Sequence, residues 1–152
     1  MTQTQQTEAL EHEVHIAARP ETVFAFFTDP ARMILWKGIE ATLDPRPGGI
    51  YRVSINGRDV ARGEYLEVVP NSRVVFTWGW EGAESPLPPG SSTVEVSLIP
   101  DGDGTLVRLR HTGLPTEIRD VHAAGWEHYL ERLTGAAEGH PMGPDPWASE
   151  PP

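Results

Sequence analysis

Apolar and polar residues alternate along most of the chain between residues 38 and 113, a pattern typical of half-buried β-strands. Short turn sequences divide this stretch into six strands, and one more alternating segment precedes them at residues 12–18. Within the fifth predicted strand, the segment RVVFTWGW covers residues 73–80. Because side chains of a strand alternate between its two faces, this segment places three aromatic rings on one face, those of Phe76, Trp78 and Trp80.

Turn residues set the boundaries between these strands. Asn56 and Gly57 predict a two-residue hairpin, because both central positions of such a turn need a positive φ. The sequence DGDG at residues 101–104 predicts another hairpin turn, and AESPLPPGS at residues 83–91 predicts an exposed loop. Gly79 lies between two tryptophans, where a missing side chain allows the strand to bend or another backbone to approach closely.

Apolar residues three or four positions apart predict helices in the remaining stretches. After the first strand, the pattern indicates a short helix from Pro20 and a second one from Pro30, capped by the side chain of Asp29. Near the C-terminus it predicts one long helix over residues 116–139, with Thr116 as its N-cap. The apolar stripe of this helix consists of Trp126, Tyr129, Leu130 and Leu133, with Ile118 and His122 on or near it.

This order of elements predicts an α+β fold. Strands joined by tight turns form an antiparallel sheet, and the buried face of that sheet needs a covering element. We therefore expect a curved antiparallel sheet of about seven strands around the long C-terminal helix, with two short helices after the first strand. A single domain would span residues 11–138, between a flexible tail at residues 1–10 and a proline-rich tail at residues 139–152. Trp147, in the second tail, is a candidate for packing back on the domain or on a partner chain.

Composition narrows the functional classes. The 152 residues contain no cysteine, which excludes disulfides, thiolate metal sites and cysteine nucleophiles. With 12 Lys and Arg against 22 Asp and Glu, the net charge is −10, which disfavours binding to nucleic acids and to anionic membrane surfaces. No signal peptide or membrane span is recognisable, so a cytoplasmic location is expected. No phosphate loop, dinucleotide motif or serine-nucleophile motif is present, and we predict neither a metal nor a cofactor.

The aromatic residues allow two interpretations. Rings between a curved sheet and one helix can form a filled core, or they can line a cavity for a ligand. The second interpretation predicts a hydrophobic or aromatic small molecule as partner. Its candidate ligand-binding residues are Trp36, Tyr51, Val53, Phe76, Trp78, Trp80, Val96, Leu109, His111, His122, Trp126 and Tyr129.

Two histidines are the weak candidates for catalysis. His111 shares a strand face with apolar residues, and His122 lies one helical turn before Trp126, so either could orient a ligand or transfer a proton. Glu64 and Glu67 are three residues apart on one strand, so at most one of them could enter a cavity. The remaining charged residues of interest are expected at the surface: His12, His15, His128, Arg52, Arg108 and Arg110.

Five stretches in this order resemble the START-like, Bet v 1-like (SRPBCC) superfamily with its helix-grip fold. They are ARPETVFAFFTDPARMILW, RPGGIYRVSI, GEYLEVVPNSRVVFTWGW, STVEVSLIPDGDGTLVRLRHTGLP and GWEHYLERL, which together cover roughly residues 12–135. More narrowly, they look like the family named after the C-terminal domain of the activator of Hsp90 ATPase (AHSA1). The resemblance implies the fold, whereas function varies across a superfamily that includes lipid carriers, hormone receptors, aromatases and cyclases.

Three functions therefore stay open. The first is a small binding module for a hydrophobic or aromatic molecule, and the second is a cyclase-type or hydrolase-type enzyme that uses His111 or His122. The third is a protein-interaction module, as the family name implies. The chain has no room for the separate N-terminal domain of the eukaryotic activator, so a chaperone partner is doubtful. A homodimer through a sheet edge or the proline-containing loop is compatible with the sequence.

Overall fold

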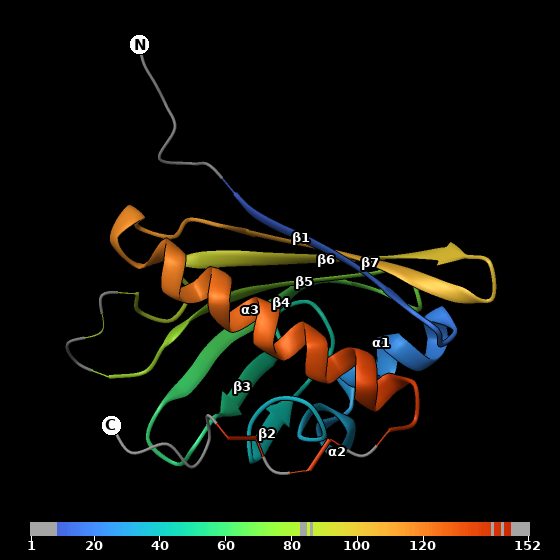
Figure 1. Cartoon of the computed structure of the whole chain (residues 1–152). Coiled ribbons are helices and arrows are strands. Elements are labelled where there is room, and N and C mark those ends of the chain that lie inside the picture. The colour runs from blue at the N-terminus through green and yellow to red at the C-terminus, as the bar shows by residue number, and fades with distance from the viewer. Residues whose placement is uncertain (1–8, 83–84, 86, 141, 144, 147–152) are drawn as a thin grey trace.

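Seven strands form one curved sheet, and the C-terminal helix lies across one face of it (Figure 1). This computed structural model describes residues 9–82, 85, 87–140, 142–143 and 145–146. In chain order the elements are β1 (Leu10–Ile16), α1 (Pro20–Thr28), α2 (Pro30–Met33), β2 (Glu40–Leu43), β3 (Ile50–Ser54), β4 (Val60–Val69), β5 (Arg73–Trp80), β6 (Ser92–Asp101), β7 (Gly104–Thr112) and α3 (Thr116–Ala137).

The order of strands across the sheet is β1-β7-β6-β5-β4-β3-β2, and every neighbouring pair is antiparallel. From β2 to β7 each strand pairs with the next in sequence, whereas β1 joins the far edge beside β7. Strands β1 and β2 lie at opposite edges of the sheet, and helices α1 and α2 connect them. The predicted helix-grip architecture is confirmed.

Side chains on the face towards α3 are buried, and those on the other face pair with charged neighbours. Along β6 the burial alternates strictly, with Val94, Val96 and Leu98 inside. On the outer face Arg108 pairs with Glu13, which confirms the predicted solvent side of that strand. The same holds for Arg110 with Glu11 and for Arg52 with Glu81.

Several element boundaries follow the sequence patterns closely. Strand β5 covers the predicted residues 73–80, and Asp29 caps α2 by accepting a hydrogen bond from the backbone N–H of Ala31 at 3.0 Å. Strand β1 begins two residues earlier than expected. Thr116 is not the N-cap of α3 but its first helical residue, because Pro115 occupies the cap position without a side-chain hydrogen bond.

The predicted two-residue turn between β3 and β4 is wrong. Five residues, 55–59, connect the strands, and of the expected pair only Gly57 has a positive φ, at 91°. The side-chain oxygen of Asn56 instead accepts hydrogen bonds from the backbone N–H groups of Arg58 and Asp59. Asparagine can close a longer loop in this way, so the Asn-Gly signal predicted the hairpin but not its length.

The sequence predicted an exposed loop after β5. Part of this loop instead packs against the sheet. Leu87 is fully buried, and its carbonyl oxygen accepts a hydrogen bond from the backbone N–H of Trp80 at 2.7 Å. A methyl group on Gly79 would overlap the carbonyl oxygen of Pro88. Gly79 therefore allows the close backbone approach that the sequence suggested, and the loop is held beside β5.

Described residues beyond α3 contact that helix. Arg132 donates a hydrogen bond to the carbonyl oxygen of Gly143 at 2.8 Å, and the hydroxyl of Tyr129 donates to the carboxylate of Asp145 at 2.6 Å. Gly143 and Asp145 thus contact the helix where the sequence predicted a tail, whereas Trp147 falls outside the described residues. None of the helices in the described part of the chain is long and apolar enough to cross a membrane.

Candidate functional site

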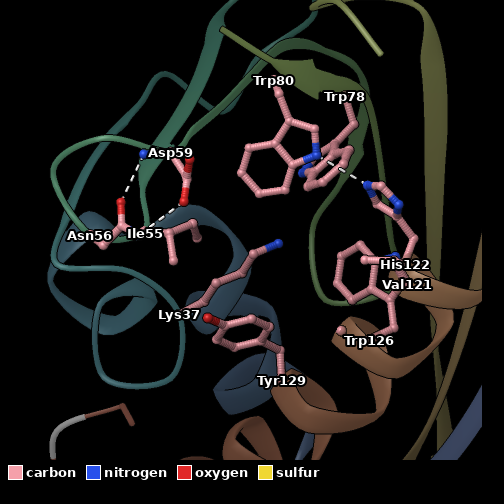
Figure 2. Close-up of a pocket in the computed structure, with 11 residues that line it drawn as sticks. Lys37, Ile55, Asn56, Asp59, Trp78, Trp80, Val121, His122, Trp126 and Tyr129 are labelled. Atoms are coloured by element: carbon pink, nitrogen blue, oxygen red, sulfur yellow. Dashed lines mark hydrogen bonds between the residues drawn. The ribbon is translucent and has the colours of Figure 1, made fainter. Parts of the chain in front are cut away.

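A cavity of about 410 Å³ lies between the end of β5, the β3–β4 loop and α3 (Figure 2). Val121 is 70% exposed on its rim, so the cavity opens to solvent beside α3. Five of its lining residues were predicted from the sequence: Trp78, Trp80, His122, Trp126 and Tyr129. Six others were not: Lys37, Ile55, Asn56, Asp59, Val121 and Gly125.

Tryptophan rings form most of the wall. Trp78 and Trp80 project from the same face of β5 and meet edge to face, with ring centroids 4.8 Å apart and an interplanar angle of 74°. Trp126 on α3 lies opposite, 6.3 Å from the ring of Trp78. Because these rings offer large apolar surfaces and few polar atoms, the wall suits a hydrophobic or aromatic molecule.

Seven predicted ligand-binding residues lie in the packed core and not on the wall of the cavity. Tyr51 stacks on Phe76 with ring centroids 4.1 Å apart, which leaves no space between them. Trp36 is buried, and its indole N–H donates to the carbonyl oxygen of Phe26 at 2.9 Å. A filled core and a cavity therefore coexist at different depths, and the core contains Trp36, Tyr51, Val53, Phe76, Val96, Leu109 and His111.

His111 is the centre of a buried hydrogen-bond chain. The indole N–H of Trp126 donates to Nδ1 of His111 at 3.0 Å, so the ring proton must be on Nε2, which lies 2.8 Å from the hydroxyl oxygen of Ser92. That hydroxyl donates to the carbonyl oxygen of Trp78 at 2.6 Å. Burial lowers the pKa of His111 to about 3, helped by the nearby His122 and Lys37. This histidine is neutral and fixes Trp126 in position.

His122 reaches the cavity wall but has both ring nitrogens occupied. Its Nε2 accepts a hydrogen bond from the indole N–H of Trp80 at 3.1 Å, drawn as a dashed line in Figure 2. The proton is therefore on Nδ1, which donates to the carbonyl oxygen of Ile118 at 2.9 Å. Burial lowers the pKa of His122, although the bond to Ile118 opposes the shift. Both histidines thus orient tryptophan rings.

Among the six lining residues that were not predicted, Lys37 is the cationic one. It lies one turn after α2, where its backbone N–H donates to the carbonyl oxygen of Met33. Its side chain is buried, and its Nζ lies 4.3 Å from the ring centroid of Trp126 and 5.3 Å from that of Trp78. Burial lowers the pKa of Lys37 to about 7. A signal was nonetheless present, because Lys37 is the only lysine of the chain and follows Trp36 in an apolar stretch.

The other singled-out residues lie away from the cavity. Glu64 and Glu67 are both exposed, because a bulge between Tyr65 and Glu67 shifts the strand register. His15 is exposed as expected. Two expected surface residues are partly buried instead, because His12 lies in the sheet and His128 contacts Asp145 at 2.8 Å. Within the described residues, no group of three or more His, Asp or Glu side chains could hold a metal ion.

Comparisons with known proteins agree on one family. Residues 17–138 match the family model described as activator of Hsp90 ATPase homolog 1-like protein. An AHSA1-like protein from Rhizobium etli, solved by NMR, is 46% identical; the match covers 96% of this chain and 91% of that chain, with a TM-score of 0.73. No curated protein matches the chain.

Two further solved structures show how widely the fold is shared. CalU16 from Micromonospora echinospora is 29% identical over 88% of this chain and 77% of that chain, with a TM-score of 0.70. An Aha1 dimer from Colwellia psychrerythraea is 20% identical over 87% of this chain and 97% of that chain, with a TM-score of 0.74. At that identity the second likeness concerns the fold alone.

Proposed function

The chain belongs to the family of activator of Hsp90 ATPase homolog 1-like proteins, and from that premise we propose that it binds a hydrophobic or aromatic small molecule in the cavity between sheet and α3. The family match supplies the fold, and the cavity supplies the functional argument. The observation that carries the proposal is the wall itself, in which three tryptophans and a tyrosine surround a space of about 410 Å³. Ligand sites are typically concave and mostly apolar with a few polar groups, and this wall has that character.

The histidines do not favour the alternative of an acid–base enzyme. Both ring nitrogens of His111 and of His122 are engaged in hydrogen bonds, so neither presents a free nitrogen to a substrate. A general base must reach the proton that it abstracts, and here the nitrogens already serve Trp126 and Trp80. We therefore assign the histidines to positioning the wall of a binding site.

Blocking the mouth of the cavity tests the proposal. The neutral fluorescent probe N-phenyl-1-naphthylamine should bind the protein and gain fluorescence as it leaves water. The substitution Val121→Trp places a large ring at the exposed rim and should weaken binding by about tenfold or more. Ala124→Trp is the matched control, because Ala124 is exposed on the same helix and does not line the cavity.

The proposal would be wrong if the probe failed to bind the wild-type protein. It would also be wrong if both substitutions reduced binding equally, since the probe would then occupy another part of the surface. Circular dichroism of the two variants should show unchanged helix content, because both positions are exposed.

A further inference from the structure

We propose that the cavity selects apolar ligands that carry a carboxylate, and that the ammonium group of Lys37 binds this carboxylate. Because this role presupposes that the cavity holds an apolar molecule, it rests on the proposed function. It adds the chemical class of the ligand and the residue that recognises it.

The position of Lys37 is the first support. Its side chain extends into the space between the rings of Trp78, Trp126 and Tyr129, as Figure 2 shows. Its Nζ lies within 4.3–6.0 Å of four ring centroids, although the residue as a whole is only 3% exposed. An aromatic cage of this kind stabilises a cation through the negative faces of the rings. The amine is therefore directed at the place where a ligand would lie.

The absence of a counter-ion is the second support. In the described part of the chain, no carboxylate forms an ion pair with Lys37, and burial is the only cause of its lowered pKa. Asp59, which lines the cavity, accepts a hydrogen bond from Asn56 at 2.9 Å, and Asp145 accepts one from the lining residue Tyr129 at 2.6 Å. Charged groups in protein interiors are normally paired, so this amine lacks a partner that an anionic ligand would supply.

The neighbouring groups favour binding over covalent chemistry at the amine. Attack of a neutral lysine on a carbonyl group would need an adjacent group to transfer protons. Both nitrogens of His122 are occupied, and the hydroxyl of Tyr129 already donates to Asp145. An ion pair between Lys37 and a carboxylate needs no such group.

Binding of a carboxylate should also depend on pH. The titratable groups around Lys37 are His111 on β7, His122 and Tyr129 on α3, and Asp59 in the β3–β4 loop. Burial lowers the pKa of both histidines and raises that of Tyr129, which leaves Lys37 as the group that changes charge near neutrality. Affinity for an anion should therefore rise as the pH falls from about 8 to about 6.

The test compares two ligands of the same shape, 2-naphthoate and the neutral 2-naphthamide. By titration calorimetry, the wild-type protein should bind the naphthoate at least about tenfold more tightly than the amide. The substitution Lys37→Met should abolish this preference and keep binding of the amide, since methionine preserves an apolar side chain of similar length. Arg58→Met is the matched control, because it removes one positive charge from the exposed part of the β3–β4 loop and should keep the preference.

A direct readout comes from the single lysine of the chain. Protein labelled with carbon-13 at the lysine Cε should give one NMR signal, whose pH titration reports the charge of Lys37. Naphthoate should raise the pKa of Lys37 by at least about one unit, and naphthamide should not.

The outcomes separate the two proposals. Equal affinity for acid and amide, or a preference that survives Lys37→Met, would overturn the role of Lys37 and leave the cavity as an apolar binding site. If neither ligand bound and N-phenyl-1-naphthylamine also failed to bind, the proposed function itself would be wrong.

Discussion

Placing an amine among tryptophan rings costs the folded protein free energy, because the charged form loses its hydration. Lys37 bears this cost without a carboxylate partner among the described residues, and the cation–π contacts offset only part of it. Residues that destabilise a fold are often retained for function. At the scale of the residue, this imbalance is the strongest sign that Lys37 has a role beyond packing.

Lys37→Met should therefore stabilise the protein in the absence of ligand. The pKa of Lys37 is about 7 in the folded state and 10.5 in its ordinary state. The penalty is full below about pH 7 and disappears as the pH rises towards about 10.5, because the folded protein releases its proton first. We expect a gain of about 4 kcal/mol in the free energy of unfolding at pH 7, measured with urea. A loss of stability, or a gain that grows between about pH 7 and pH 10, would contradict this.

His111 should make the protein less stable in acid. The pKa of His111 is about 3 in the folded protein and 6.5 in its ordinary state. Between these two pH values the unfolded chain binds a proton at this residue and the folded protein does not. Stability should fall as the pH drops from about 6.5 towards 3, by about 2 kcal/mol at pH 5. Glutamine does not titrate and can replace both hydrogen bonds of the ring. His111→Gln should therefore remove about 2 kcal/mol of the difference in unfolding free energy between about pH 7 and pH 5.

His15→Gln provides the control for this experiment, because His15 is exposed and lies outside the hydrogen-bond chain. Its acid sensitivity should match that of the wild-type protein. If the His111→Gln variant also lost as much stability in acid as the wild-type protein, protonation of His111 would not be the cause of that loss of stability.

At the scale of the element, the loop after β5 packs against this strand, whose Trp78 and Trp80 line the cavity. The link is the backbone contact at Gly79, beside the hydrogen bond from Trp80 to Leu87. Gly79→Ala should push the loop away and reduce the free energy of unfolding by about 2–4 kcal/mol in urea denaturation.

Gly90→Ala in the same loop should cost only about 1 kcal/mol, because Gly90 has a positive φ but open space around it. Equal costs for the two substitutions would show that the close approach at Gly79 does not contribute. The comparison thus separates steric overlap from backbone strain.

The sequence was sufficient for most elements, since alternation and helical spacing report which faces are buried. The sequence was least informative where hydrogen bonds of the folded chain decide the length of a turn or the register of a strand. The side chain of Asn56 lengthened a predicted turn, and a bulge after Tyr65 turned both expected carboxylates outward. Neither effect is visible in a pattern of apolar and polar residues, because both depend on hydrogen bonds that form only in the folded chain.

At the scale of the whole molecule, the same patterns could not locate the boundary between core and cavity. All twelve predicted site residues lie in or beside the space between sheet and α3, but only five of them line the cavity. Depth depends on how the sheet curves around the helix, which no local pattern specifies. Lys37 was missed for a related reason, because a lysine in a strongly acidic chain is expected at the surface.

The fold and the family do not specify a ligand. The residues that line the cavity indicate its chemical class. A molecule with a net charge of −10 places its single lysine inside a tryptophan-lined space. An acidic apolar ligand would match both the rings and this amine. A cytoplasmic location, a homodimer and the absence of nucleic-acid partners remain predictions from the sequence.

The most direct test of binding in this cavity uses the indole N–H signals of the tryptophans in a proton–nitrogen NMR spectrum, during titration with N-phenyl-1-naphthylamine. Trp78, Trp80 and Trp126 line the cavity, whereas Trp36 is buried in the core and serves as an internal control. We predict that the signals of the three lining tryptophans shift with a common saturation curve, while that of Trp36 stays in place. Unchanged signals from the lining tryptophans, or an equal shift of Trp36, would contradict binding between the sheet and α3.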